Sequence, residues 1–363
     1  MNFIVFDLEW NQAPGGRLRE NPKIPFEILE IGAVKLNGRR KIVGHFHETV
    51  KPLVYTRMNR YTQKVVHMDM SELKKSRTFS PVARSFLSWC GRNPVFVTWG
   101  PSDLFELQRN LDYYHIQYRF PKPLLYVDLQ KLYSLGCLDG KKRPALHEAV
   151  EAMQIEQDRP FHAAFDDAWY TAQIMRKLEN FKNLLPYKSV DYYHLPENPK
   201  EEFTLDFKTY SKFVSMLYPD KETALKSESV TSLCCHRCGR PLLPRINWFS
   251  GAGGSMYYAL GDCVKHGPEK GKLRIRKGAG EEVYIVKTIK SATEKDVAEI
   301  EERRQTAQER RHRRMEKEKE KRRARRQSSQ GGEAAAKARA PRAHGKARRR
   351  RGKKPNEASA ESK

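Results

Sequence analysis

Apolar residues near the start of the chain fall into short runs, of the length that β-strands have, separated by polar turns. The first three runs predict strands over residues 2–6, 26–36 and 42–52. Asn37-Gly38, between the second and third runs, is a hairpin signal, so we expect an antiparallel meander. Asp7 and Glu9 directly follow the first run, and because side chains alternate along a strand, both project from the same face.

Beyond the meander, the pattern alternates between helical and strand periods. Helices are predicted over 79–91 and 145–153, from Asp103 through Leu111, and through Tyr170 and Leu178, and short strands over 94–99 and 126–129. Ser102 is placed to cap the helix that begins at Asp103. Strands that alternate with helices predict a mixed α/β sheet with helices packed on it.

The two acids after the first strand are candidate metal ligands. Two carboxylates at the end of a core strand are costly unless a positive charge lies between them. A divalent cation is the usual solution, since Asp and Glu oxygens are its preferred ligands. The alternative is a strand that leaves the core and places Asp7 and Glu9 in solvent.

Two later segments supply further candidates. Asp103 lies at a strand-to-helix junction, where active-site residues of α/β proteins often lie, although a first-turn acid is also favoured by the helix dipole. Asp166 and Asp167 open another predicted helix, and His162 precedes Asp167 by five residues. A single histidine is more often structural than catalytic, but this one comes directly before a helix with an acidic first turn.

In chain order, these motifs resemble those of the DEDDh family of 3′→5′ exonucleases, which includes ribonuclease T and proofreading exonucleases. The matching motifs are Asp7-Leu8-Glu9, Glu30-Ile31-Gly32-Ala33, Asp103, and His162 with Asp167. Thr98-Trp99-Gly100 before Asp103 is most similar to the Eri-type RNA exonucleases and the KapD-like branch. The resemblance covers about residues 1–185 and implies a ribonuclease H-like mixed sheet flanked by helices.

The resemblance also implies the role of each site residue. Asp7 would bridge two Mg²⁺ or Mn²⁺ ions in each active site. Glu9 and Asp167 would complete the site of one ion, and Asp103 would act on the other ion through water. His162 would be the general base, a task that an ordinary imidazole pKa of about 6.5 suits. Two ions can activate a water and stabilise the leaving oxyanion of a phosphodiester.

Some positions in the resemblance leave alternatives open. Either acid of the Asp166-Asp167 pair is a possible ligand, and the family spacing favours Asp167. Phe6, Trp10 and Phe165 are candidates for stacking on terminal bases, although aromatic residues beside a core strand more often pack inside the protein.

Four residues farther along have the spacing of a zinc site. Cys235 and Cys238 form a Cys-x2-Cys pair, and Cys263 and His266 form a Cys-x2-His pair. Two tight pairs of this kind favour one structural, tetrahedral Zn²⁺ in a zinc-ribbon-like module. Cys234 is a poorer substitute for Cys235, and the alternative is a group of buried free cysteines.

Composition points to a polyanionic partner. The net charge is +25 with 31% charged residues, which suits nucleic acid or an anionic membrane surface. No apolar run is long enough to span a bilayer, which needs about 18 residues, and no secretory signal is visible. Few, clustered cysteines suit a reducing compartment, so we expect a cytoplasmic protein with no membrane partner.

These features divide the chain into four predicted parts: an exonuclease domain (1–185), a connector (186–232) with a helical stretch around 207–217, the zinc-ribbon-like module (233–290), and a charged helix with a basic disordered tail (291–363). Within the last part, 299–326 is predicted as a solvated helix and 327–363 as disordered. The tail suits RNA, including a ribosome or structured RNA. Alternating cations over 270–277 predict either a basic face against nucleic acid or a solvated edge strand.

The sequence therefore predicts a metal-dependent 3′→5′ exonuclease that acts on single-stranded nucleic acid ends, with RNA as the favoured polymer. The alternatives are a DNA exonuclease and a non-catalytic nucleic-acid-binding adaptor that keeps the nuclease fold as a scaffold.

Overall fold

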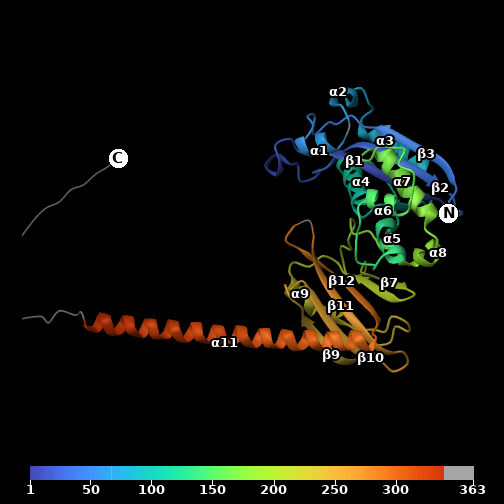
Figure 1. Cartoon of the computed structure of the whole chain (residues 1–363). Coiled ribbons are helices and arrows are strands. Elements are labelled where there is room, and N and C mark those ends of the chain that lie inside the picture. Colours follow the sequence, from blue (N-terminus) through green and yellow to red (C-terminus); the bar gives the residue numbers. More distant parts are fainter. Residues whose placement is uncertain (67, 279, 339–363) are drawn as a thin grey trace, which may run out of the picture. The chain divides into compact units, whose positions relative to one another are not determined.

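The fold is built around two six-stranded sheets (Figure 1). The computed structural model describes residues 1–66, 68–278 and 280–338, and gives only the backbone of Arg17 and of 323–338. Met1–Ile300 forms one compact unit, and the chain from Glu301 belongs to a second.

The first sheet has the strand order β3-β2-β1-β4-β5-β6. Its strands are β1 (Phe3–Asn11), β2 (Glu27–Leu36), β3 (Ile42–Thr49), β4 (Val95–Thr98), β5 (Leu125–Asp128) and β6 (Ser189–Val190). β1, β2 and β3 pair antiparallel, whereas β4 runs parallel to β1 and β5 parallel to β4. The predicted meander and mixed sheet are confirmed.

Helices cover this sheet. They are α1 (Arg60–Val65), α2 (Met70–Leu73), α3 (Phe79–Cys90), α4 (Ser102–Tyr113), α5 (Leu129–Cys137), α6 (Leu146–Ala152), α7 (Ala164–Lys177) and α8 (Phe181–Leu184), with short 3-10 turns at Arg17–Arg19 and Leu185–Tyr187. Alternate residues of β1 enter two separate cores: Phe6 packs with residues of α3 and α4, and Val5 with residues of α5 and α7. A strand that is buried on both faces has an almost continuous apolar sequence, which explains its strong signal.

Two local predictions need correction. β1 does not end at Phe6 but continues to Asn11, with a register shift between Glu9 and Trp10, because β2 pairs with it along its whole length. Ser102 is the first residue of α4 rather than its cap, since Pro101 precedes the helix and no side chain caps it.

The second sheet has the order β7-β8-β12-β11-β10-β9. Its strands are β7 (Phe203–Phe207), β8 (Tyr210–Val214), β9 (Leu243–Ser250), β10 (Met256–Cys263), β11 (Gly267–Lys277) and β12 (Val283–Ser291). The predicted helical stretch over 207–217 is wrong, because β7 and β8 form an antiparallel hairpin there. β11 lies between β10 and β12, so it is not an edge strand.

Two short helices, α9 (Lys221–Lys226) and α10 (Glu228–Thr231), precede the second group of strands. A single long helix, α11 (Glu294–Ala338), follows them (Figure 1). α11 includes the predicted helix 299–326 and continues through 327–338, where we expected disorder, while 339–363 lie outside the described residues. Pairs such as Glu309 with Arg313 and Arg314 with Glu318, each four positions apart, support a solvated helix.

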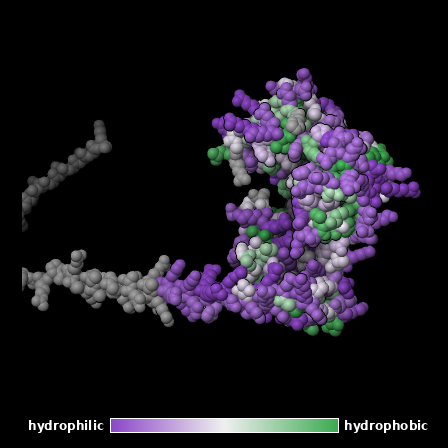
Figure 2. Space-filling view, viewed as in Figure 1, coloured by the Kyte–Doolittle hydropathy of each residue, from purple (hydrophilic) through white to green (hydrophobic). Residues whose placement is uncertain are grey.

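Hydrophilic residues cover most of the face shown in Figure 2, and apolar residues form small separate patches on it. Among the residues that the structure describes, no helix combines the length and the apolar character that a bilayer span requires.

Candidate active site

The contact between α7 and β2 determines where the acids meet. Gly32 on β2 lies opposite Asp7 of β1, and a Cβ atom on Gly32 would lie 2.1 Å from the backbone nitrogen of Phe165 in α7. Only glycine lets the helix approach this closely. As a result, the acidic first turn of α7 lies directly against the strands that carry Asp7 and Glu9.

This packing gathers acids from three segments. Carboxylate oxygens of Asp7, Glu9 and Asp167 all lie within 4.8 Å of one another. Asp103, from the first turn of α4, is buried, and its Oδ1 accepts a hydrogen bond of 3.3 Å from the backbone N–H of Leu8, between the two strand acids. The structure thus brings all four predicted acids together.

Asp166 lies outside this cluster. Its Oδ1 accepts a hydrogen bond of 2.9 Å from the Nη1 of Arg159, and that arginine guanidinium also lies over the rings of Phe165 and Trp169. Asp166 is therefore neutralised by a neighbour, whereas the Oδ1 of Asp167 is buried and has no hydrogen-bond partner among the described residues.

Burial and mutual repulsion make these carboxyls reluctant to ionise. Burial, then Asp103, Asp167, Glu9 and Glu30, raises the pKa of Asp7 well above its ordinary value. Burial, followed by the neighbouring acids, raises the pKa of Glu9 to about 8. Burial is also the main reason why the pKa values of Asp103 and Asp167 are raised to about 7 each. A cluster of this kind needs a cation to be fully ionised near neutral pH.

Glu30 is a fifth acid that we did not single out for a role. It lies opposite Glu9 in the sheet and is only 3% exposed. Its Oε1 lies 2.6 Å from the Nε2 of His47, and its Oε2 accepts a hydrogen bond of 3.0 Å from the backbone N–H of Ala164. Glu30 therefore fixes the start of α7. An acid between the apolar residues Leu29 and Ile31 of a predicted strand was the available signal.

His162 lies in the loop before α7, where its backbone has a left-handed φ of 66°. Its backbone N–H donates a 3.2 Å hydrogen bond to the Oδ2 of Asp167, so residue 162 lies directly beside the cluster. The residue is exposed, and its imidazole is therefore open to solvent and substrate.

Of the three aromatic candidates for base stacking, Phe6 is excluded. Its ring is 1% exposed and packs between Phe86 and Phe96, with ring centroids 5.8 and 5.7 Å away. Trp10 and Phe165 are only partly buried, and Phe165 stacks on the ring of His47 at 5.6 Å.

The acid cluster fits hard divalent cations. Its donors are carboxylate oxygens, which Mg²⁺ and Mn²⁺ prefer, and the unpartnered Oδ1 of Asp167 is a buried lone pair without a donor.

The cysteine cluster lies on the second sheet. Cys235 and Cys238 precede β9, Cys263 ends β10, and His266 lies in the turn before β11; their ligand atoms lie within 4.8 Å of one another. The Cys238 and Cys263 sulfurs are 3.7 Å apart, and the Nδ1 of His266 is 3.3 Å from the Cys235 sulfur. A tetrahedral site with Zn–S bonds of about 2.3 Å has edges of about this length.

The turns around this cluster depend on glycine. Gly239 and Gly267, one residue after each pair of ligands, have φ values of 68° and 77°. Cys234 does not join the cluster and instead forms a backbone bridge with Pro241.

Behind the cysteine cluster lies a buried acid that the spacing did not reveal. Glu269 is fully buried, its Oε1 accepts a 2.9 Å hydrogen bond from the Cys235 thiol, and its Oε2 accepts one of 2.9 Å from the backbone N–H of His236. Its position on β11 ties the first knuckle to the sheet.

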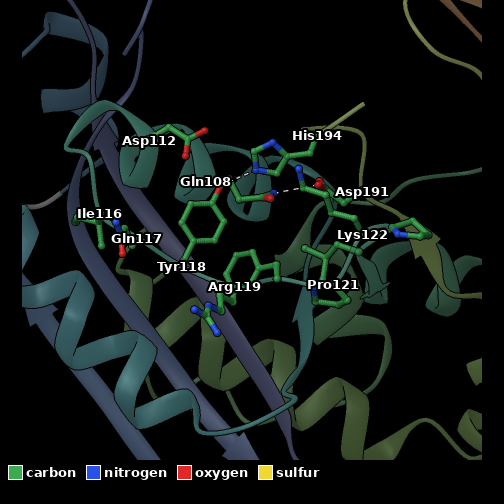
Figure 3. Close-up of a pocket in the computed structure, with 13 residues that line it drawn as sticks. Gln108, Asp112, Ile116, Gln117, Tyr118, Arg119, Pro121, Lys122, Asp191 and His194 are labelled. Carbon is green, nitrogen blue, oxygen red and sulfur yellow. Dashed lines mark hydrogen bonds between the residues drawn. The ribbon is translucent and has the colours of Figure 1, made fainter. Parts of the chain in front are cut away.

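A cavity of about 620 Å³ lies between the second half of α4, the segment 116–124 and residues 191 and 194 (Figure 3). None of the four clustered acids lines it. Gln108 donates a 3.1 Å hydrogen bond to Asp191 inside it, and the Tyr118 hydroxyl lies 2.8 Å from the Nε2 of His194. This cavity is separate from the candidate catalytic groups.

The comparison with protein families agrees with this geometry. The RNase_T family model, described as Exonuclease, matches residues 4–175. This matched segment is similar to the exonuclease domains that the family model describes. The match includes all four clustered acids and His162 of the exonuclease domain. No curated protein matches the chain significantly.

Several solved structures resemble the exonuclease domain at low identity. The nuclease domain of 3′hExo, described as a DEDDh family member bound to rAMP, is 19% identical with a TM-score of 0.42, covering 50% of this chain and 92% of that one. Cell-death related nuclease 4 is 18% identical with a TM-score of 0.42, covering 52% and 66%. E. coli exonuclease I, in a zinc-bound complex with single-stranded DNA, is 16% identical with a TM-score of 0.41, covering 51% and 42%.

Proposed function

We propose that the protein is a metal-dependent 3′→5′ exonuclease that hydrolyses phosphodiester bonds at single-stranded nucleic acid ends. The observation that carries the proposal is the meeting of Asp7, Glu9 and Asp167 within 4.8 Å, with Asp103 bonded to the same strand. Such a cluster is costly to keep unless it binds cations, and it lies in the segment that matches the exonuclease family model.

Each residue has a proposed task. Divalent ions bound at the cluster would lower the pKa of the attacking water and stabilise the leaving oxyanion. Asp7, Glu9 and Asp167 would hold them, and Asp103 would contribute through water. His162 would take the proton from the attacking water, and the hydrogen bond from its N–H to Asp167 keeps the residue beside the cluster.

We propose RNA as the preferred polymer. The support is the Thr98-Trp99-Gly100 resemblance to Eri-type RNA exonucleases, together with the basic character of the chain beyond the exonuclease domain. Mg²⁺ or Mn²⁺ would serve the acids, and one Zn²⁺ would hold the Cys235, Cys238, Cys263 and His266 group.

The test is a time course on 5′-labelled single-stranded RNA and its DNA counterpart, with and without Mg²⁺. We expect a ladder that shortens from the 3′ end, faster on RNA. Asp167→Asn should reduce the rate by at least about a hundredfold, because it would weaken the binding of the ions that stabilise charge in the transition state.

Asp166→Asn is the matched control, because Asp166 pairs with Arg159 outside the cluster; its rate should stay within a few fold of wild type. Equal rates for the two variants would refute the assigned ligands. Binding without cleavage of either polymer by the wild type would instead support an adaptor, and faster DNA cleavage a DNA exonuclease.

A further inference from the structure

The second sheet has two different faces. On one face, helices α9 and α10 pack against Phe213, Leu273 and Ile285 in an apolar core. Because side chains alternate, the residues between these positions point to the opposite face.

One row across this face is cationic and aromatic. Lys212 of β8 lies opposite Thr288 of β12, which lies opposite Lys272 of β11, which lies opposite Tyr258 of β10. Four neighbouring strands therefore place a lysine, a threonine, a second lysine and a tyrosine side by side.

Two more cations follow along β11 on the same face. Arg274 and Arg276 are two and four positions beyond Lys272, and both are exposed. We call Lys212, Lys272, Arg274, Arg276 and Tyr258 the basic strip.

Apolar residues of this face are covered by other segments. Tyr192 and Leu195 pack on Val214, Tyr284 and Val286, beside Arg274 and Arg276. Val297 and Ile300 of α11 pack on Ile246 and Leu260. These contacts bury apolar parts of the face, whereas Arg274 and Arg276 stay exposed.

The cations of the basic strip repel one another. Lys212 is near Lys131 of α5 and near Arg274 and Arg276; burial first, and then these three cations, lowers its pKa to about 8. In the described part of the chain, no salt bridge joins Lys212, Arg274 or Arg276 to a carboxylate. An anion bound across them would relieve this repulsion.

Aromatic rings lie beside these cations and favour one class of polyanion. The Lys272 amine lies 5.6 Å from the Tyr258 ring centroid, and the Arg276 guanidinium 5.1 Å from that of Tyr192. Aromatic rings interleaved with cations favour single-stranded nucleic acid, whose bases stack while its phosphates contact the cations. A duplex hides its base faces from such stacking.

We propose that the basic strip binds single-stranded nucleic acid, with its cations on successive phosphates and Tyr258 against a base. This deepens the proposed function and rests on it, since the bound strand is the one whose 3′ end is cut. The second sheet would thus hold the body of the substrate, and the acid cluster its end.

The test measures binding of a labelled single strand to the full chain as a function of salt. The double variant Arg274→Gln with Arg276→Gln is made in an Asp7→Asn background, so that the probe is not cut. No chelator is then needed to stop cleavage, and the zinc site keeps its ion. Losing two phosphate contacts should lower the slope of log K against log salt by about 1.4 and weaken binding by about tenfold. Arg274→Lys with Arg276→Lys should restore both.

Lys221→Gln with Lys226→Gln is the matched control, because these exposed lysines lie on α9, over the opposite face, and their loss changes the net charge equally. Binding and slope equal to those of this control would overturn the proposal. Equal affinity for a duplex of the same sequence would overturn the assignment to single strands.

Cleavage by the wild type reports separately on the proposed function. If wild type fails to cleave while the arginine variant loses binding, the proposed function fails and the basic strip remains. If wild type cleaves and the arginine variant binds like its control, only the basic strip fails.

Discussion

Gly32 is the residue on which the exonuclease site depends most directly. In Gly32→Ala, the new Cβ would lie 2.1 Å from the backbone nitrogen of Phe165, a contact that backbone atoms cannot accept. α7 must then move away from β2 and carry Asp167 away from Asp7. We expect at least about a hundredfold loss of cleavage and a loss of stability of about 2–4 kcal/mol, typical of overpacking against a rigid neighbour, measured by activity assay and urea unfolding.

Gly44→Ala is the control, since the nearest atoms to its added Cβ would belong to the side chains of Trp89 and Lys35, at ordinary distances of 3.6 and 3.8 Å. Near-normal cleavage by Gly32→Ala would show that α7 need not lie this close.

The raised pKa values predict how stability depends on pH when no divalent ion is added. Glu9 has a folded pKa of about 8 and Asp103 one of about 7, whereas unfolded carboxyls have pKa values of about 4. Between these values the folded state holds protons that the unfolded state has released, so the free energy of unfolding falls as pH rises from about 4 to 8. Tm should therefore be lower at pH 8 than at pH 5, and saturating Mg²⁺ should remove most of the difference.

Asp103→Asn removes one of these titrating groups and should make the fall in Tm shallower, whereas Glu151→Gln, at an exposed position, should leave it unchanged. A Tm that rises with pH in the absence of divalent ions would contradict the burial of these acids.

At the residue scale, the candidate metal ligands were easier to predict from the sequence than the residues that hold the surrounding backbone in place. Asp7 and Glu9 stand out because two carboxylates at the end of a core strand are costly without a cation. Asp103 and Asp167 stand out because they follow these two acids in the order of the family motifs. Glu30 and Glu269 were missed as supporting groups because their roles lie in backbone contacts with Ala164 and His236, which distant segments provide. No local pattern encodes such contacts.

At the scale of elements, the knuckles and strands β9, β10 and β11 should depend on zinc together. Cys263→Ser removes a buried ligand sulfur at the end of β10 and should abolish stoichiometric zinc and lower Tm, since binding free energy at such sites is folding free energy. Cys234→Ser, one residue outside the cluster, should keep one zinc per chain. Metal analysis and thermal unfolding measure both, and equal zinc content in the two variants would refute the ligand set.

Elements with one clear pattern were predictable, and those with conflicting patterns were not. α3 has nearly its expected extent because its apolar residues follow the helical period, and β2 because it is a long, mostly apolar run that ends at a turn signal. The segment 207–217 has apolar residues at 207, 210, 213, 214 and 217, which mimic a helix. In the structure, Phe213 packs beneath α9 while Val214 packs with Tyr192 on the other face, so both faces of β8 are apolar and the strand alternation is lost.

At the scale of the whole molecule, charge is the dominant feature. Removing 301–363 deletes the second unit and the Arg348–Arg351 cluster, while keeping Val297 and Ile300 on the second sheet. We expect weaker RNA binding and a flatter salt dependence, because fewer counterions are released. Replacing only Arg348–Arg351 with glutamine should give a smaller change in the same direction, and an unaltered salt slope after truncation would contradict this role.

The hydrogen bonds around the acid cluster join segments that are far apart in the sequence, and this affects how the protein folds during synthesis. Leu8 and Asp103 are 95 residues apart, and Glu30 and Ala164 are 134 residues apart, yet each pair shares a hydrogen bond beside the acids. During translation, the strand with Asp7 and Glu9 emerges long before α7, so a nascent chain cannot assemble the cluster until nearly the whole domain has left the ribosome. For about the first half of its synthesis, the chain therefore carries the acids of β1 without the helix that completes their cluster.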